Sequence, residues 1–142
     1  MSEIKLGIIG GGQLGSMLAT AAKKLNIKTI ICCDDINGPA QKFCDEFIHS
    51  KYNDKEKIYE FAKKVDIITY EFENIPFETL NELNKLKLVL PKPSVNRLIQ
   101  HRLAEKDFIN KLNIRTTRYV SVKKKEDLLT LDDFLPGILK TT

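Results

Sequence analysis

A glycine-rich turn from Gly10 to Gly15 has the composition and spacing of a site for a negatively charged group. Its glycines follow the pattern Gly-x-Gly-x-x-Gly, between an apolar run and a segment of helical periodicity. Glycine lets the backbone approach a ligand closely, and the N–H groups and dipole of a helix start favour an anion. We therefore expect a phosphate or carboxylate at this turn. A turn that serves only close packing of a strand against a helix is the alternative that the pattern leaves open.

Two acids, Asp34 and Asp35, follow the second apolar run of the chain. They lie about 20 residues after the glycines, where a dinucleotide-binding protein holds a ribose hydroxyl. The pair is therefore compatible with an NAD-dependent oxidoreductase domain. That signal is weak when it stands alone, because it rests on one short pattern and one acid.

Two further acids, Glu71 and Glu73, follow the strand expected at residues 66–70. Ligands of open parallel sheets bind at the carboxyl ends of strands, so this position and the glycine turn should share one edge. A carboxylate there can accept hydrogen bonds from paired hydroxyls. We favour Glu71 over Glu73, and a solvated acid in a turn stays open for either.

Four segments together resemble the N5-carboxyaminoimidazole ribonucleotide synthases of purine biosynthesis. They are Gly10 to Ala19, Pro39-Ala40, Thr69 to Pro76 and Gln100 to Lys106, and they occur in the family's order over essentially the whole chain. The resemblance implies an ATP-grasp protein whose Rossmann-like first lobe binds the ribonucleotide instead of NAD. Members of the family use ATP and bicarbonate to carboxylate aminoimidazole ribonucleotide through a carboxyphosphate intermediate.

The resemblance also implies roles for individual residues of the first lobe. Gly12, Gln13, Leu14 and Gly15 would receive the substrate phosphate or its neighbourhood. Glu71 would meet the ribose hydroxyls from the end of its strand. Aminoimidazole ribonucleotide is therefore the expected small-molecule partner.

Two cations occupy positions where the family contacts ATP. Arg102 would contact the nucleotide and Lys140 its phosphates, as a fork and a point charge suited to phosphate oxygens. His101 stands where the family has an acid before the arginine. The family continues beyond the position of Thr142 into a glycine-rich loop and a lobe that holds magnesium. ATP and magnesium are thus expected of the complete enzymes, and no cofactor is expected on this chain alone.

The expected function is that of a truncated synthase that keeps ribonucleotide binding and does not complete the reaction. One half of a split synthase, restored by a complementary fragment, is an alternative, with the apolar stretch from Tyr119 to Leu139 as its interface. A stand-alone nucleotide-binding module is another. A homodimer also stays open, because the family is commonly dimeric.

The elements that must position these residues alternate between strand and helix, which predicts an α/β protein with a parallel, Rossmann-like sheet. This pre-ATP-grasp domain should cover residues 1–115, and residues 116–142 should begin an ATP-grasp domain. Expected strands are 4–9, 28–33, 46–50, 66–70, 87–90, 119–122 and 137–140. Expected helices are 13–24, 39–47, 54–64, 76–85, 94–111, as one helix or two, and 126–134.

Composition excludes several classes of partner. The 142 residues are 42% hydrophobic and carry a net charge of +4, with lysines spread over the chain, so we expect no nucleic-acid partner. The three cysteines have no metal-ligand spacing and are expected to be buried thiols. No apolar stretch approaches a membrane span and the start of the chain has no signal-peptide pattern, so we expect a cytosolic protein.

Overall fold

The computed structural model describes residues 4–141. The chain divides into two compact units, one that ends at Arg97 and one that begins at Leu98. The boundary expected between residues 115 and 116 falls inside the second unit. Assignment of residues 116–142 to an ATP-grasp domain stays a prediction.

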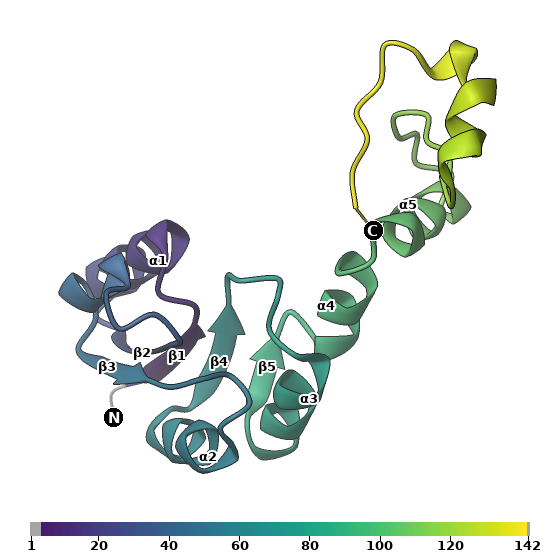
Figure 1. Cartoon of the computed structure of the whole chain (residues 1–142). Coiled ribbons are helices and arrows are strands. Elements are labelled where there is room, and N and C mark those ends of the chain that lie inside the picture. Colours follow the sequence, from purple (N-terminus) through teal and green to yellow (C-terminus); the bar gives the residue numbers. More distant parts are fainter. Residues whose placement is uncertain (1–3, 142) are drawn as a thin grey trace. The chain divides into compact units, whose positions relative to one another are not determined.

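The first unit is built on a five-stranded sheet in which every neighbouring pair of strands is parallel (Figure 1). The order β3-β2-β1-β4-β5 is that of a doubly wound α/β fold, and the predicted fold class is confirmed. Neighbours β1 and β4 pair from Leu6 opposite Ile67 to Ile9 opposite Tyr70. The strands are β1 (Lys5–Ile9), β2 (Lys28–Cys33), β3 (Glu46–His49), β4 (Ile67–Tyr70) and β5 (Leu88–Leu90).

Helices cover both faces of this sheet, with α1 on one side and α2 and α3 on the other (Figure 1). Asp54 caps α2, because its carboxylate accepts a hydrogen bond of 3.2 Å from the backbone N–H of Lys57. Pro76 precedes α3, where a missing N–H costs nothing. The helical elements are α1 (Gln13–Lys24), η1 (Pro39–Lys42, 3₁₀), α2 (Lys55–Lys64), α3 (Phe77–Leu86) and α4 (Pro93–Ile99).

The core of the unit consists of two layers because successive strand residues point to opposite faces of the sheet. Ile8 and Cys33 pack against α1 and η1, whereas Ile9 and Cys32 pack against α2 and α3. All four side chains are buried, and Phe61 of α2 is the largest fully buried side chain. Apolar burial on both faces explains why the strands read as continuous apolar runs in the sequence.

The second unit contains α5 (Arg102–Lys111) and two 3₁₀ segments, η2 (Lys125–Thr130) and η3 (Asp132–Phe134). The predicted strands at residues 119–122 and 137–140 are wrong, because within residues 4–141 the last strand is β5. A strand needs a neighbour to accept its backbone hydrogen bonds, and these two apolar runs have none in this unit. The helix predicted at 126–134 is instead the two 3₁₀ segments.

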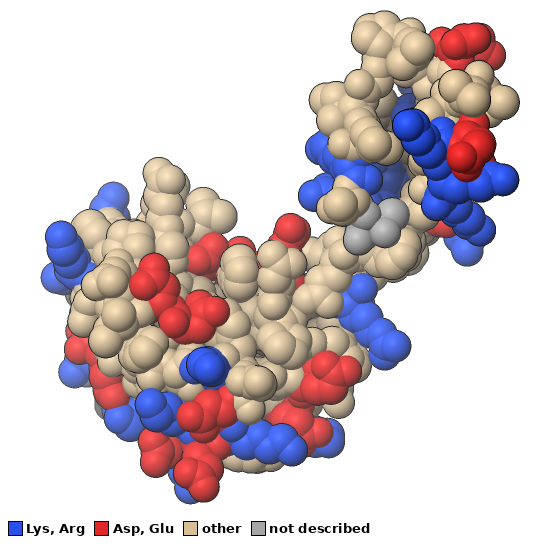
Figure 2. All heavy atoms as spheres, in the orientation of Figure 1, with Lys and Arg blue, Asp and Glu red and all other residues tan. Residues whose placement is uncertain are grey.

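Charges of both signs are interspersed on the visible face of the first unit (Figure 2). This mixture is typical of a solvated surface, so it gives no support to a nucleic-acid partner. Of the helices that residues 4–141 form, none has the length and apolar character needed to cross a bilayer.

Burial makes the pH dependence of stability a test of the core. It raises the pKa of the Cys32 thiol to about 12, and the neighbouring Cys33 and Asp34 add to the increase. The unfolded chain releases this proton from about pH 8.5 upward while the folded chain keeps it, so unfolding is favoured as the pH rises between these values. We expect a contribution of about 1.4 kcal/mol per pH unit, which urea unfolding between pH 9 and 11 would measure on wild type and Cys32→Ala. Equal pH slopes for the two proteins would contradict it.

Candidate functional site

The glycine turn lies between the end of β1 and the start of α1. Gly10 adopts a φ of +111°, a conformation that L side chains rarely adopt, and its N–H donates to the carbonyl of Cys32 at 2.9 Å. Gly12 is the N-cap residue of α1, and no side chain caps that helix start. The turn therefore leads directly into the start of α1, and anion binding there stays a prediction.

Glu71 meets this turn from the end of the neighbouring strand. Its backbone N–H donates to the carbonyl of Ile9 at 3.1 Å, which continues the pairing of β1 with β4. Its half-buried carboxylate Oε1 accepts a hydrogen bond of 3.2 Å from the N–H of Gly12. The expectation that the glycine turn and this acid share one edge of the sheet is confirmed. Glu73 is exposed and lies outside the cavity described next.

A cavity of about 240 Å³ opens at this edge. It lies at the switch point of the sheet, where the strands that follow β1 are added on one side (β2, β3) and then on the other (β4, β5). Its volume is below the roughly 300 Å³ at which pockets for drug-sized ligands begin, so it suits one nucleotide better than a dinucleotide. It is lined by the turn, the ends of β2 and β4, and two loops. The lining residues are Gly10, Gly11, Gly12, Cys33, Asp34, Asp35, Gly38, Pro39, Tyr52, Glu71 and Phe72.

The charge of the cavity is one-sided. Asp34, Asp35 and Glu71 contribute carboxylates, and the lining residues include no lysine or arginine. Negative charge at the wall favours hydroxyl donors and disfavours a phosphate in the interior of the cavity. The start of α1 is the more favourable position for a negative group, because backbone N–H groups and the helix dipole oppose the acids there.

Three of the predicted binding residues lie at that helix start and not in the cavity wall. Gln13 and Leu14 are exposed on the first turn of α1, and their contact with a ligand stays a prediction. Gly15 is buried, and a Cβ added to it would lie 2.5 Å from the carbonyl oxygen of Gly10. Close packing of α1 against the turn accounts for this glycine. Of the four residues expected to receive the phosphate, Gly12 to Gly15, Gly12 alone lines the cavity.

Tyr52 and Phe72 are cavity residues that sequence reasoning did not assign. Tyr52 follows β3, and only the position of β3 beside β2 brings it to the cavity. Phe72 directly follows Glu71, which was the available signal for it. The two rings have centroids 6.0 Å apart and are tilted by 42°.

The predicted ATP contacts belong to the second unit. Arg102 is the first residue of α5, and Lys140 lies in the extended segment near the end of the described chain. Both are exposed, and within residues 4–141 neither forms an ion pair. His101 caps α5, because its Nδ1 accepts a hydrogen bond of 3.3 Å from the N–H of Ala104. This cap gives the histidine that replaces the family's acid a structural role.

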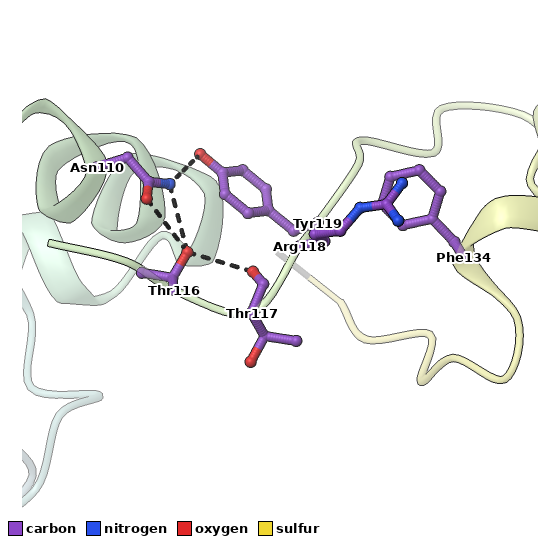
Figure 3. Close-up of a pocket in the computed structure, with 6 residues that line it drawn as sticks. All are labelled: Asn110, Thr116, Thr117, Arg118, Tyr119 and Phe134. Atoms are coloured by element: carbon purple, nitrogen blue, oxygen red, sulfur yellow. Dashed lines mark hydrogen bonds between the residues drawn. The ribbon is translucent and has the colours of Figure 1, made fainter. Parts of the chain in front are cut away.

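A second cavity, of about 280 Å³, lies within the second unit (Figure 3). Its polar side chains mainly bond one another, since the Tyr119 hydroxyl donates to Asp107 at 2.5 Å and accepts from Asn110 at 3.2 Å. Arg118 places its guanidinium carbon 4.6 Å from the centre of the Phe134 ring. These groups are already partnered, so the glycine-turn cavity is the better candidate site although it is slightly smaller.

Metal binding has no candidate cluster in the part of the chain that the structure describes. Groups of three or more histidine, cysteine or acidic side chains with suitable geometry do not occur between residues 4 and 141. The described cavity therefore offers backbone groups, carboxylates and aromatic rings as its binding chemistry.

A doubly wound parallel sheet with a glycine turn and a carboxylate at its switch point defines a Rossmann-like α/β domain. The family model described as "Ribonucleotide synthetase preATP-grasp domain" matches residues 3–100. The chain belongs to this family.

Known relatives agree with this assignment. The N5-carboxyaminoimidazole ribonucleotide synthase of Staphylococcus epidermidis is 36% identical over 138 residues, which cover 96% of this chain and 37% of that protein. The crystal structure of N5-carboxyaminoimidazole synthetase from Staphylococcus aureus, complexed with ADP, matches with a TM-score of 0.83 and 32% identity, covering 93% of this chain and 36% of that one. The Aspergillus clavatus synthase in complex with ADP and 5-aminoimidazole ribonucleotide gives a TM-score of 0.72 at 30% identity, covering 82% and 31%. The chain thus spans about a third of the length of these relatives.

Substitution of Gly15 tests how tightly the turn and α1 are packed. A Cβ at this position would contact the Gly10 carbonyl oxygen at 2.5 Å, so the backbone of the turn must shift. We expect Gly15→Ala to lower the free energy of unfolding by about 1 to 3 kcal/mol, although alanine is the better helix former. Urea unfolding measures the change. Thr20→Ala, an exposed position on the same helix, is the control and should stay within about 0.5 kcal/mol of wild type. A Gly15→Ala protein as stable as wild type would mean that the turn is loosely packed.

Proposed function

We propose that this chain is the ribonucleotide-binding lobe of an N5-carboxyaminoimidazole ribonucleotide synthase, and that its ligand is aminoimidazole ribonucleotide. The observation that carries the proposal is the contact between the Glu71 carboxylate and the Gly12 N–H at the switch point of the sheet. The names of the relatives support the choice of ligand, and the Aspergillus clavatus synthase is described with that ribonucleotide bound.

In this proposal Glu71 accepts hydrogen bonds from the ribose hydroxyls. An ionised carboxylate has about four acceptor sites, and the Gly12 N–H uses one, so the others can serve the sugar. The bond to the turn also holds the carboxylate in one orientation, which reduces the entropy lost when the ligand binds. Ribose binding and loop position are therefore coupled through one side chain.

The phosphate would lie at the start of α1, beside Gln13 and Leu14. Three acids in the cavity wall make the interior unfavourable for the negatively charged phosphate. The helix start is the nearest source of unpaired N–H donors. This placement separates the phosphate from the ribose-binding acid and explains why the two exposed residues do not line the cavity.

We propose further that carboxylation needs the remaining two thirds of a synthase, in the same polypeptide or in a partner. Phosphoryl transfer depends on positioned cations around the phosphates, and a carboxyphosphate intermediate must be sheltered from water. Arg102 and Lys140 would contribute two of the cations that contact ATP. A split synthase meets this requirement, whereas a homodimer of the 142 residues or a stand-alone module would bind the ribonucleotide without carboxylating it.

Calorimetric titration with aminoimidazole ribonucleotide tests the proposed ligand. We expect weak binding to the 142-residue chain, because the lobes that would bury the base in a complete synthase contribute much of the affinity. Glu71→Ala should lower the affinity roughly tenfold or more, since a hydrogen bond to a charged group is worth about 1.5 to 3 kcal/mol. Glu73→Ala should change the affinity by less than about twofold. NAD should not bind, because its second nucleotide has no room in the cavity.

Three outcomes would contradict this assignment. Tight binding of NAD would identify the cavity as a dinucleotide site. Ribonucleotide binding that is lost with Glu73→Ala and kept with Glu71→Ala would mean that the other acid holds the sugar. No heat signal with the ribonucleotide at millimolar concentration would remove the proposed ligand altogether.

Phosphate release tests the proposed requirement for the remaining lobes. The purified 142-residue chain, given ATP, magnesium, bicarbonate and aminoimidazole ribonucleotide, should release phosphate no faster than a sample without protein. The full-length Staphylococcus epidermidis synthase, a relative about three times as long, is the positive control under the same conditions. Any release by the chain that depends on the ribonucleotide would show that these residues suffice for ATP chemistry.

A further inference from the structure

Phe72 contributes a large aromatic ring to the wall of the glycine-turn cavity. It follows Glu71 directly in the chain and lines the same cavity, and 38% of its surface is exposed. Exposure alone does not distinguish it, because Phe43 is 48% exposed in the same unit and lines neither described cavity. What distinguishes Phe72 is its place beside the acid and the glycine turn.

Tyr52 packs against this ring. It is 7% exposed, and its ring centroid lies 6.0 Å from that of Phe72 with a tilt of 42°, a favourable aromatic arrangement. Its hydroxyl lies 4.0 Å from the sulfur of Cys33, and its carbonyl accepts a hydrogen bond of 2.7 Å from the Thr79 hydroxyl. Burial raises the pKa of the Tyr52 hydroxyl above its ordinary value. Tyr52 is thus held at its hydroxyl and at its backbone carbonyl, and it limits how far the Phe72 ring can move toward it.

The geometry of a nucleotide connects this ring to the site. The base is attached to the sugar carbon next to the one that carries the 2′-hydroxyl. A ribose whose hydroxyls are held by Glu71 therefore brings the base within reach of the next side chain, which is Phe72. A flat heteroaromatic ring gains free energy by stacking on an aromatic side chain, largely independent of which base it is.

We infer that Phe72, supported by Tyr52, is the surface on which the heteroaromatic ring of the bound ribonucleotide stacks. Phe72 is then a specificity-determining residue that favours ligands with a base over plain sugar phosphates. The inference rests on the proposed function, because it requires a ribonucleotide at Glu71.

Paired titrations with aminoimidazole ribonucleotide and ribose 5-phosphate test it. The second ligand keeps the sugar and phosphate and lacks the ring. Wild type should bind the ribonucleotide more tightly, and Phe72→Leu should lower that affinity about fivefold while leaving ribose 5-phosphate unchanged. Phe72→Tyr keeps the ring and should stay within about twofold of wild type for both ligands. Phe43→Leu is the matched control and should change neither affinity.

The arms of this experiment separate the inference from the proposed function. Wild type that binds the ribonucleotide, with Phe72→Leu equal to it, would overturn the stacking role alone. Equal loss of both ligands in Phe72→Leu would also overturn it, because the ring would then act on the shape of the site. Wild type that binds neither ligand would overturn the proposed function and the inference together. Circular dichroism of each variant verifies that the fold is intact.

Discussion

The parallel pairing of β1 with β4 brings the Gly10 to Gly12 turn against the carboxylate of Glu71, and the rest of the site follows from that contact. Neither segment could form the site alone, because the turn supplies backbone donors and the strand end supplies the acceptor. The positive φ of Gly10 lets the chain leave β1 without covering the acid. A side chain at that position would collide with Glu71, since an added Cβ would lie 2.8 Å from its Oε1.

Electrostatics then divides the site into two regions. The cavity wall carries three carboxylates from the ends of β2 and β4, whereas the start of α1 carries the positive end of a helix dipole. A sugar phosphate satisfies both regions only if its hydroxyls face the acids and its phosphate faces the helix. The aromatic pair Tyr52 and Phe72 adds an apolar surface next to the acids, so the proposed ribonucleotide would meet acids, aromatic rings and a helix start at one edge of the sheet.

The strand predictions were right for the first unit and wrong for the second, for a physical reason. The runs at β1, β2 and β4 are apolar on both faces because helices cover the sheet on both sides, and such runs are visible in the sequence. The runs at residues 119–122 and 137–140 have similar composition. Composition records that a segment favours an extended backbone, but a strand also needs a neighbour within hydrogen-bonding distance.

Local sequence determined the glycine turn, the acid at the end of β4 and the α/β alternation, because each depends on residues close together in the chain. Which of Glu71 and Glu73 faces the turn was decided by the pairing of β4 with β1, since that register places Glu71 opposite the end of β1. Tyr52 reaches the cavity only because β3 lies beside β2. Gly15, which the resemblance implies as a ligand contact, also approaches the Gly10 carbonyl closely, and its contact with a ligand stays a prediction. Tertiary structure made these choices because each is a distance between residues far apart in sequence or between atoms of adjoining turns, and no local pattern encodes such distances.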